Sequence, residues 1–520
     1  MTRLKSYLGG RWVEGTGPAE TLLNPATEEP LASVAAGGLD RASALAFARA
    51  KGGPALRAMT LAERGALVKA MADTLSAHRN ELLDLAVTSG GNTRGDAKFD
   101  VDGAIFTLSA YADLGRALGD TKVLVDGEGV QLGRTPRFHG QHVSVPRHGA
   151  AVHINAFNFP AWGLAEKAAC ALLAGMPVVS KPGTSSALVA HRIMELLVDA
   201  KSLPEGALQL LVGGVGDLLE HLGPQDVVAF TGSSETGIKI RSLAQVIRHS
   251  VRVNVEADSL NAAMLGPDVN RGDETYELFV KDVVRDMTQK AGQKCTAIRR
   301  VLIPAAVADR LRDDLVDRLS AIVVGNPAHE RVRMGPLATA AQRDDVREGI
   351  SALARDGRLV LGSAEVDAIG APPGKGFYVS PALVELEEGA EAPAVHGREV
   401  FGPVATIVPY SGRADDAATI TARGQGGLVS AVYSEDPAFT TEVVLGLAPY
   451  HGRVFLGSAK IAEQSPGPGT VLPQLVHGGP GRAGGGEELG GVRGLAFYRQ
   501  RVALEGSRPM IEKLAGTKGL

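Results

Sequence analysis

One of the chain's two cysteines has neighbours that suit nucleophilic chemistry. Cys295 follows Gly-Gln-Lys, and Arg299 and Arg300 come shortly after it. The glycine and the polar neighbours indicate an irregular, accessible backbone, and we expect the two cations to favour the thiolate. A structural cysteine is an equally good interpretation of the spacing alone, since a nucleophile also requires oxyanion donors and, for hydrolysis, a base. Cys170 lies in an apolar helical run and is predicted to be a buried packing residue.

Two polar residues near predicted strand ends have types that could complete such a site. Asn158 lies between an apolar strand and a helix that begins near Pro160. Its amide can donate to a developing oxyanion, and a turn or cap residue is the alternative. Glu256 ends the apolar run Val-Arg-Val-Asn-Val. Because a carboxylate at the mouth of a parallel sheet is poorly solvated, we expect a raised pKa and a role as general base, with a salt-bridged structural glutamate as the alternative.

A glycine-containing turn, Phe230-Thr-Gly-Ser-Ser-Glu-Thr-Gly237, joins a predicted strand to a helix. The backbone N–H groups at the helix start, with the Ser233 hydroxyl, suit a phosphate or pyrophosphate, and a plain helix cap is the alternative. The turn is not a Walker A loop, because Ile-Lys follows its last glycine, and no G-x-G-x-x-G fingerprint is present in it. Lys181 directly follows another buried strand, where it is predicted to bind ribose hydroxyls or a phosphate, or to be a solvated lysine.

These residues depend on alternating strands and helices between residues 149 and 256. Apolar strands are predicted at 150–154, 178–180, 208–212, 227–230 and 251–255, and helices at about 160–173, 186–200 and 234–244, with a short one near 218. Such βαβ units with right-handed crossovers give a doubly wound parallel sheet. Since ligands bind at the carboxyl ends of its strands, we expect one cleft there. Its expected members are Asn158, Lys181, Gly232 and Glu256.

The remaining segments differ from one another in pattern. Residues 4–32 predict short strands, 39–118 predict amphipathic helices, and 120–147 predict a hairpin with 125–130 between its strands. A second alternating region runs from about 260 to 466, with strands near 301–303, 405–408 and 454–456. The tail 477–494 is dense in glycine.

Composition excludes several classes of protein. The 520 residues carry 54 Lys+Arg and 58 Asp+Glu, a net charge of −4, which indicates no surface for nucleic acid. A hydrophobic content of 44% excludes wholesale disorder, and the length suggests about two to four domains. We expect no signal peptide, no membrane span, no disulfide framework and no metal site, and therefore a cytoplasmic, reducing location. The 65 glycines indicate many tight turns or a backbone that approaches a ligand closely.

Six segments, taken in order, resemble the NAD(P)-dependent aldehyde dehydrogenase superfamily over nearly the whole chain. They are Phe157-Asn-Phe-Pro160, Lys181-Pro182, Phe230–Gly237, Glu256, Gly292-Gln-Lys-Cys295 and Glu399-Val-Phe-Gly-Pro403. The resemblance implies an α/β fold with two doubly wound domains and a small β oligomerisation element, in a homodimer or a dimer of dimers. It implies these boundaries: a cofactor-binding domain at 1–122 and 148–258, a catalytic domain at 259–475, and oligomerisation elements at 123–147 and 476–520.

The resemblance also implies roles for individual residues. Cys295 would be the nucleophile, Asn158 an oxyanion donor and Glu256 the general base. The implied cofactor contacts are Phe157, Lys181, Gly232, Ser233, Glu399 and Phe401, the last near the nicotinamide ribose. Lys167 matches a lysine that the family keeps near its active site, and a surface helix lysine is the alternative.

Two departures from the family pattern bear on the cofactor and the substrate. Ala-Asp-Ser-Leu follows Glu256, where the family usually has Leu-Gly-Gly-Lys. Thr184 stands where an acidic residue commonly binds the adenosine 2′- and 3′-hydroxyls. A carboxylate there would repel a 2′-phosphate, whereas Thr184 and Ser185 can donate to it. We therefore predict that NADP is preferred, with Lys181 beside its phosphate, and that NAD is used less well.

These departures and the glycine-dense tail resemble one subgroup of the superfamily, which oxidises CoA-linked semialdehydes such as 3,4-dehydroadipyl-CoA semialdehyde in benzoyl-CoA degradation. They also resemble the dehydrogenase domain of the phenylacetate-pathway ring-opening protein. The resemblance implies oxidation to the acid through a thiohemiacetal and a thioester on Cys295, which water hydrolyses. A CoA-acylating dehydrogenase and a non-catalytic cofactor-binding protein are the alternatives. Glu256 argues against a CoA-acylating dehydrogenase, because an enzyme in which CoA attacks the thioester needs no base to activate water. The presence of both Cys295 and Glu256 argues against a non-catalytic protein.

Overall fold

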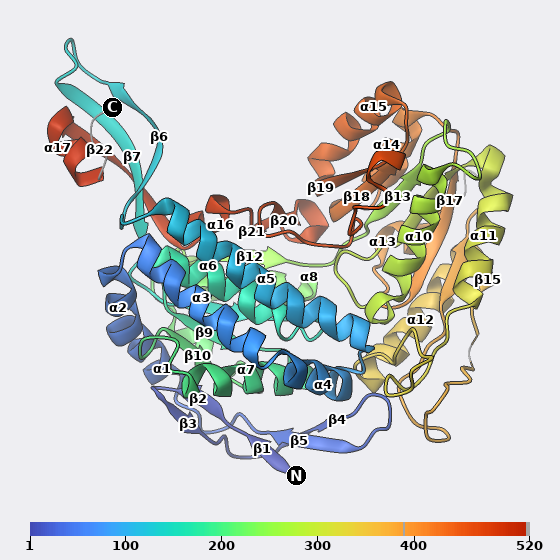
Figure 1. Ribbon diagram of the computed structural model, residues 1–520, viewed down its shortest axis with the longest axis horizontal. Coiled ribbons are helices and arrows are strands. Elements are labelled where there is room, and N and C mark those ends of the chain that lie inside the picture. The colour runs from blue at the N-terminus through green and yellow to red at the C-terminus, as the bar shows by residue number, and fades with distance from the viewer. Residues whose placement is uncertain (364, 388–390, 516–520) are drawn as a thin grey trace.

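Two seven-stranded sheets organise the chain, which is seen here as a computed structural model that describes residues 1–363, 365–387 and 391–515 (Figure 1). One sheet gathers strands from the first half of the chain and the other gathers strands from the second half. Both are mainly parallel and are covered by helices. The predicted α/β fold with two doubly wound sheets is therefore confirmed.

The first sheet has the βαβ order expected from residues 149–256. Across the sheet lie β12 (Arg252–Glu256), β11 (Val227–Thr231), β8 (Ala151–Ile154), β9 (Val178–Lys181), β10 (Leu208–Leu210), β2 (Ser6–Leu8) and β3 (Arg11–Val13). The first five strands pair in parallel, and β2 and β3 extend the sheet in antiparallel fashion. From β8 the chain proceeds outward through β9 and β10, and then returns to β11 on the other side. A crevice for ligands is expected where the order reverses, at the carboxyl ends of β8 and β11.

Helices from the first half of the chain pack on this sheet (Figure 1). They are α1 (Arg41–Phe47), α2 (Gly53–Ala58), α3 (Leu61–Ala77), α4 (Arg79–Gly90), α5 (Arg94–Leu118), α6 (Trp162–Ala174), α7 (Ala187–Asp199), α8 (Ser234–Arg241) and α9 (Ala244–His249). Thr60 and Thr93 begin α3 and α5 with reciprocal capping boxes. Every residue of α6 is buried, because the helix contacts α3 and α5 as well as β8 and β9. Cys170 in this helix is 3% exposed, as its apolar neighbours predict.

The second sheet repeats the same architecture. Its order is β15 (Arg358–Leu361), β16 (Ala382–Glu385), β17 (Val404–Tyr410), β14 (Arg300–Pro304), β13 (Ala262–Leu265), β18 (Gly427–Tyr433) and β19 (His451–Gly457), and all but β15 run parallel. The accompanying helices are α10 (Glu274–Thr288), α11 (Ala308–Ser320), α12 (Ala340–Asp356), α13 (Pro393–Gly397), α14 (Ala414–Ala422) and α15 (Pro437–Leu447). Its core includes the edge-on contact of Phe279 with Tyr433, whose ring centroids lie 5.1 Å apart.

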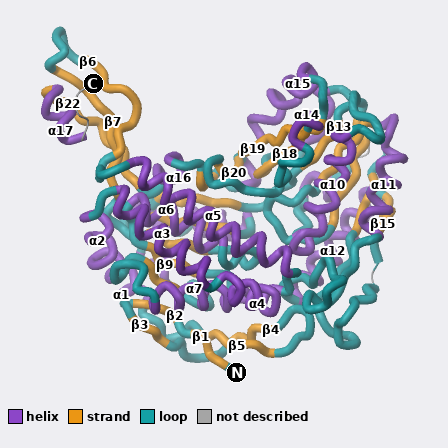
Figure 2. Tube along the Cα trace, viewed as in Figure 1, coloured by secondary structure: helices purple, strands orange, loops and turns teal. Residues whose placement is uncertain are grey.

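A three-stranded arm projects from the body (Figures 1 and 2). It consists of β6 (Leu124–Gln131), β7 (Phe138–Pro146) and β22 (Arg499–Ser507), and α17 (Arg508–Ala515) contacts it. The predicted hairpin is present, but the placement of 125–130 between its strands is wrong, because these residues lie within β6. The pairing of β6 with β7 shifts between Asp126 and Val130, where Gly127 has a φ of 72°. A bulge therefore absorbs the two glycines, and the turn follows at 132–137.

Two small sheets complete the fold. β1 (Thr2–Leu4), β5 (Pro30–Val34) and β4 (Glu20–Leu23) form one, and β20 (Val476–Gly479) pairs with β21 (Gly486–Leu489) in the other. β20 contacts β18 and β19 of the second sheet, whereas β21 contacts β12 and α6 of the first. The glycine-dense tail thus bridges the two sheets, and α16 (Val492–Ala496) follows it. Among the described residues, no helix combines the length and apolarity that crossing a bilayer requires.

Candidate active site

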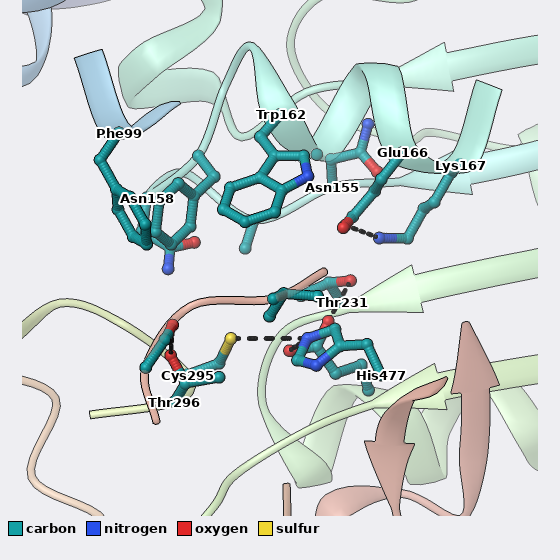
Figure 3. A pocket seen from close by; sticks show the side chains of 16 residues that line it. Phe99, Asn155, Asn158, Trp162, Glu166, Lys167, Thr231, Cys295, Thr296 and His477 are labelled. Atoms are coloured by element: carbon teal, nitrogen blue, oxygen red, sulfur yellow. Dashed lines mark hydrogen bonds and ion pairs between the residues drawn. The ribbon is translucent and has the colours of Figure 1, made fainter. Parts of the chain in front are cut away.

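A pocket at the carboxyl ends of β8, β11 and β12 brings Asn158, Glu256 and Cys295 together (Figure 3). The residues that line it come from β11, β12, α5, α6 and the loop after β8, and also from the loop before β14, the loop after β19 and β20. The lining residues are Phe99, Asn155, Ala156, Asn158, Phe159, Trp162, Gly163, Glu166, Lys167, Thr231, Glu256, Cys295, Thr296, Gly469, Val471 and His477. The expected convergence therefore occurs for Asn158 and Glu256. Lys181 and Gly232 end or follow neighbouring strands of the same sheet but do not line this pocket.

The backbone before Cys295 adopts an unusual conformation. Lys290, Ala291 and Gly292 have φ values of 54°, 51° and 69°. For the two non-glycine residues this left-handed region costs roughly 1–2 kcal/mol each, so other contacts must hold the loop. At Gly292 glycine is also required by space, because a Cβ there would lie 2.1 Å from the carbonyl oxygen of Gly402.

Buried polar contacts hold this loop in place. The Lys290 Nζ donates to Asn92 Oδ1 at 3.0 Å, and the backbone N–H of Lys290 donates to Asp96 Oδ1 at 3.0 Å. Lys294 Nζ pairs with Asp286 Oδ1 at 2.8 Å, with both side chains fully buried. Asn261 Nδ2 donates to the carbonyl oxygen of Cys295 at 2.8 Å. These contacts offset the conformational free energy that the left-handed residues cost, and they fix the position of the Cys295 thiol.

The environment of the Cys295 thiol differs from the sequence prediction. Burial and the nearby Glu256 carboxylate raise the pKa of Cys295 well above its ordinary value. Of the two arginines expected to stabilise the thiolate, Arg299 interacts with the Cys295 charge, whereas Arg300 is engaged elsewhere. Arg300 donates to the carbonyl oxygens of Leu260 and Thr421, and Arg299 donates to that of Gly402. Arg453 from β19 also interacts with the Cys295 charge, so Arg299 and Arg453 favour the thiolate while Glu256 opposes it.

Asn158 lies beside the Cys295 loop, as Figure 3 shows. The side chain is 8% exposed, and its Nδ2 donates to the carbonyl oxygen of Gln293 at 3.0 Å. An amide nitrogen carries two hydrogens, so one of them remains for an oxygen atom that develops charge above the thiol. The loop between β8 and α6 holds Asn158 at this position, as the strand-end pattern predicts.

Glu256 is the last residue of β12 and is 2% exposed. Its Oε2 accepts a hydrogen bond from Thr231 Oγ1 at 3.2 Å. Burial alone would raise the pKa of Glu256, but His477 and then Lys167 outweigh it and lower the pKa to about 2. The expectation of a raised pKa is therefore wrong, because two cationic groups from distant segments face this carboxylate. Glu256 is ionised at neutral pH, the form that a general base requires.

His477 is a buried pocket residue that no sequence motif marks. It lies in β20 and is 3% exposed. Its Nε2 is 3.2 Å from Glu256 Oε1 and 3.8 Å from Cys295 Sγ. A single histidine in a glycine-dense segment was the available signal, but its neighbours in space belong to other parts of the chain.

Lys167 points into the same pocket from α6 and is 2% exposed. Its Nζ lies 2.9 Å from Glu166 Oε1 and 3.1 Å from Glu488 Oε2. Burial opposes the charged lysine, but the surrounding carboxylates outweigh it and raise the pKa of Lys167. The alternative of a surface helix lysine is therefore wrong. The oxygens of Glu166, Glu256 and Glu488 lie within 4.8 Å of one another, and the Lys167 ammonium supplies the cation that this cluster needs.

The predicted phosphate-binding residues lie along the same sheet edge. Lys181 ends β9, and Thr184 and Ser185 lie in the short 3-10 helix that follows. Within the described part of the chain, these three side chains form no hydrogen bond or ion pair. Burial lowers the pKa of Lys181, although the Glu20 carboxylate opposes the shift. Three adjacent donors without partners fit the oxygens of a phosphate group.

The β11–α8 turn offers fewer donors than the sequence predicts. Ser233 caps α8, and its Oγ accepts from the Thr236 N–H, which is the helix-cap alternative. The Ser234 N–H and Oγ donate to Asp258, at 3.3 and 2.7 Å. Gly232 donates its N–H to the carbonyl oxygen of Glu256 at 3.1 Å. Asp258 belongs to the segment that departs from the family pattern, so this departure places a carboxylate at the start of α8.

The segment with Glu399 and Phe401 lies against the Cys295 loop. Glu399 Oε1 is 3.4 Å from Arg299 Nη2, and its Oε2 accepts from the Ser259 N–H at 3.1 Å. Burial raises the pKa of Glu399 to about 7 even though Arg299 opposes the shift. The rings of Phe401 and Phe157 meet edge-on, with their centroids 6.0 Å apart. The predicted cofactor contacts Phe157 and Phe401 thus meet across the two halves of the chain, and Glu399 lies two residues before Phe401.

Comparison with known proteins extends these observations to the whole chain. The sequence profile described as the aldehyde dehydrogenase family matches residues 12–500. The 3,4-dehydroadipyl-CoA semialdehyde dehydrogenase of Aromatoleum evansii is 47% identical over 479 residues, which cover 92% of this chain and 93% of that one. The protein MaoC of Klebsiella aerogenes is 43% identical over 178 residues, which cover 34% of this chain and 52% of that protein. Betaine aldehyde dehydrogenase of Staphylococcus aureus, solved in complex with NAD+, superposes with a TM-score of 0.83 at 24% identity over 99% of this chain and 96% of that one, which shows a shared fold.

Proposed function

The chain belongs to the aldehyde dehydrogenase family, and we propose that it oxidises a CoA-thioester semialdehyde to the acid with NADP as hydride acceptor. The observation that carries the proposal is one pocket that holds a thiol, an amide donor and an ionised carboxylate. They belong to Cys295, Asn158 and Glu256. The extensive identity to a relative named for 3,4-dehydroadipyl-CoA semialdehyde supports this substrate class.

The proposed cycle assigns one role to each of these groups. The Cys295 thiolate attacks the aldehyde carbon, and the oxyanion accepts hydrogen bonds from Asn158 Nδ2 and the Cys295 backbone N–H. One such donor contributes roughly 3–4 kcal/mol in comparable sites. NADP, when bound, would supply the hydride acceptor, so that collapse of the thiohemiacetal would leave a thioester on Cys295. Glu256 then takes a proton from water as the water oxygen attacks the thioester, and the acid leaves.

An apolar wall of the pocket suits an acyl chain behind the reacting carbonyl. Phe99, Phe159 and Trp162 line this wall and meet edge-on, with ring centroids 5.6–5.7 Å apart. Rings locked against one another leave a contact surface that does not adjust to substrate shape. A linear methylene chain fits such a surface, and the CoA moiety would remain outside the pocket.

The substrate proposal predicts a clear preference in parallel assays. With NADP present, we expect kcat/KM for a CoA-thioester semialdehyde to exceed that for free aliphatic aldehydes by about tenfold or more, because binding energy from the remote part of a substrate is used at the reacting centre. NADPH formation and the acid product are measured without added CoA. Equal kcat/KM values would contradict the CoA-linked substrate. Product formation that depends on free CoA would instead favour a CoA-acylating dehydrogenase.

For the cofactor, we propose that Lys181, Thr184 and Ser185 hold the 2′-phosphate of NADP, while Gly232, Ser233, Glu399, Phe157 and Phe401 contact the rest of the molecule. The support is the group of three donors without partners at the end of β9. The wild-type enzyme should then have a higher kcat/KM with NADP than with NAD.

The Thr184→Asp variant tests this assignment. We expect kcat/KM for NADP to fall by about tenfold to a hundredfold, since one hydrogen bond to a charged group contributes about 1.5–3 kcal/mol and the new carboxylate repels the phosphate. The kcat/KM for NAD should fall much less than that for NADP. Thr184→Val is the matched control that removes the donor without adding charge, and it should show a smaller loss. A wild-type enzyme that uses NAD as well as or better than NADP would refute the proposal.

The arm is proposed as the oligomerisation element of a homodimer or dimer of dimers. Exposed apolar side chains support this role: Val125, Val130, Leu132, Phe138, Val502, Met510 and Leu514. Residues 476–491 instead lie against the two sheets, and His477 of this segment lines the pocket. We therefore propose to restrict the oligomerisation element to residues 124–146 and 499–515, with the cofactor-binding and catalytic domains divided near residue 258.

A further inference from the structure

The β20–β21 pair places an imidazole between the thiol and the carboxylate of the pocket. His477 belongs to β20, which contacts β18 and β19, and its partner β21 contacts β12. The side chain is therefore held by elements of both sheets and is almost completely buried. Figure 3 shows the ring beside Cys295, on the side of the pocket opposite Asn158.

One ring nitrogen faces both reactive groups. His477 Nε2 lies 3.8 Å from Cys295 Sγ and 3.2 Å from Glu256 Oε1. The other nitrogen, Nδ1, has no hydrogen-bond partner among the described residues. The polar contacts of this ring with the described residues are thus confined to the thiol and the carboxylate. Both face Nε2, so a proton on this nitrogen lies between the sulfur and the Glu256 oxygen.

We propose that His477 accepts the proton of the Cys295 thiol and holds the resulting thiolate as an ion pair beside Glu256. The S–H bond breaks, its electron pair stays on Sγ, and the proton moves to Nε2. This inference rests on the proposed nucleophilic role of Cys295. It assigns His477 a catalytic role and leaves the Glu256 carboxylate free to take a proton from water at the later step.

The charges around the ring support an imidazolium. Glu256 faces it from β12, Glu166 from α6 and Glu488 from β21, and these carboxylates favour the protonated ring. Arg453 from β19 opposes it, and Lys167 in α6 compensates the same carboxylates. Burial alone would lower the pKa of His477, but Glu256 outweighs it and raises the pKa.

Glu256 also contacts the thiol, but its negative charge opposes ionisation of the sulfur. Burial and the Glu256 charge raise the pKa of the thiol, so Cys295 needs a cation close to sulfur in order to ionise. His477 and Glu256 both lie beside the sulfur, and His477 is the one of the two whose protonated form carries the charge that favours a thiolate.

Thiol alkylation tests the proposal without substrate or cofactor. The rate of iodoacetamide alkylation is measured from pH 5 to 10 in a Cys170→Ala background, so that Cys295 is the single thiol. We expect a midpoint below about 8.5, the ordinary value for cysteine. In His477→Gln the rate at pH 7 should fall tenfold or more, and the midpoint should rise by at least one pH unit.

A matched variant distinguishes the two candidate acceptors. Glu256→Gln should alkylate at pH 7 within about threefold of the parent, because the imidazole remains beside the sulfur. His477→Phe serves as a second replacement, and circular dichroism reports whether each variant is folded. Unchanged alkylation in a folded His477 variant would overturn the proposal. If the alkylation rate at pH 7 fell as far in Glu256→Gln as in His477→Gln, the proposal would be overturned as well, and the carboxylate would be the favoured proton acceptor.

The assay also separates this inference from the proposed function. Alkylation reports the ionisation of Cys295 whatever the aldehyde or cofactor, so an error in either assignment leaves its result intact. Conversely, aldehyde oxidation by Cys295→Ala would show that Cys295 is not the nucleophile. That result would not contradict an ion pair between Cys295 and His477.

Discussion

Replacing Cys295 with alanine is expected to lower kcat for aldehyde oxidation by about 10⁴-fold or more, because no thioester can form without the sulfur. Other functional groups of the pocket, among them Asn158 and Glu256, remain in the variant, so aldehyde and cofactor should still bind. The measurement is NADPH formation under saturating cofactor, together with cofactor binding by fluorescence.

Cys170 offers a matched control for the same substitution. Its thiol is buried in α6, where burial raises the pKa to about 12 and keeps it protonated. Cys170→Ala should therefore retain kcat within about twofold, although it removes a packed sulfur atom. Substantial turnover by Cys295→Ala, or loss of turnover in Cys170→Ala with the fold intact, would contradict the assignment of the nucleophile.

Glu256→Gln is expected to separate the two halves of the reaction. Thioester formation needs the thiolate and the oxyanion donors, so about one equivalent of NADPH per site should appear in a rapid burst. Hydrolysis lacks its base, and the steady-state rate should fall by about 10² to 10⁴-fold. Stopped-flow absorbance of NADPH measures both phases, and mass spectrometry of the quenched protein should find the acyl group on Cys295.

The neighbouring tail provides the control for Glu256. Glu487 is exposed, and Glu487→Gln makes the same chemical change outside the pocket. This variant should keep the wild-type steady-state rate. Sustained turnover by Glu256→Gln would refute its role as the base for water, and the absence of a burst would show that the carboxylate is needed before the thioester forms.

Local sequence patterns were sufficient for the scaffold. Alternating apolar strands and helices between residues 149 and 256 predicted the parallel sheet, and β8, β9, β11 and β12 form within one or two residues of their expected bounds. The placement of Asn158 and Glu256 at strand ends followed from the same rule. The hairpin was predicted as well, but the strand position of Val125–Val130 was not, because a bulge depends on pairing with β7 rather than on local turn residues.

The electrostatics of the site required the tertiary structure. A strand-end carboxylate was expected to have a raised pKa, whereas His477 and Lys167 lower that of Glu256. Two arginines near Cys295 in sequence were expected to favour its thiolate, but Arg300 is bound to backbone carbonyls, and Arg453 from a distant strand joins Arg299 in facing the Cys295 charge. The sign of a pKa shift depends on which charges lie within a few ångströms, and those charges come from segments far apart in the chain.

The sequence by itself therefore determined the strands of the first sheet and the candidate residues near their ends, since side-chain chemistry and periodicity are local properties. Only the tertiary structure decided the protonation states of those groups and the membership of His477 in the pocket. The β20–β21 tail bridges the two sheets and packs its histidine between sulfur and carboxylate. No local pattern encodes that contact, because it exists only when both sheets are folded and packed against the tail.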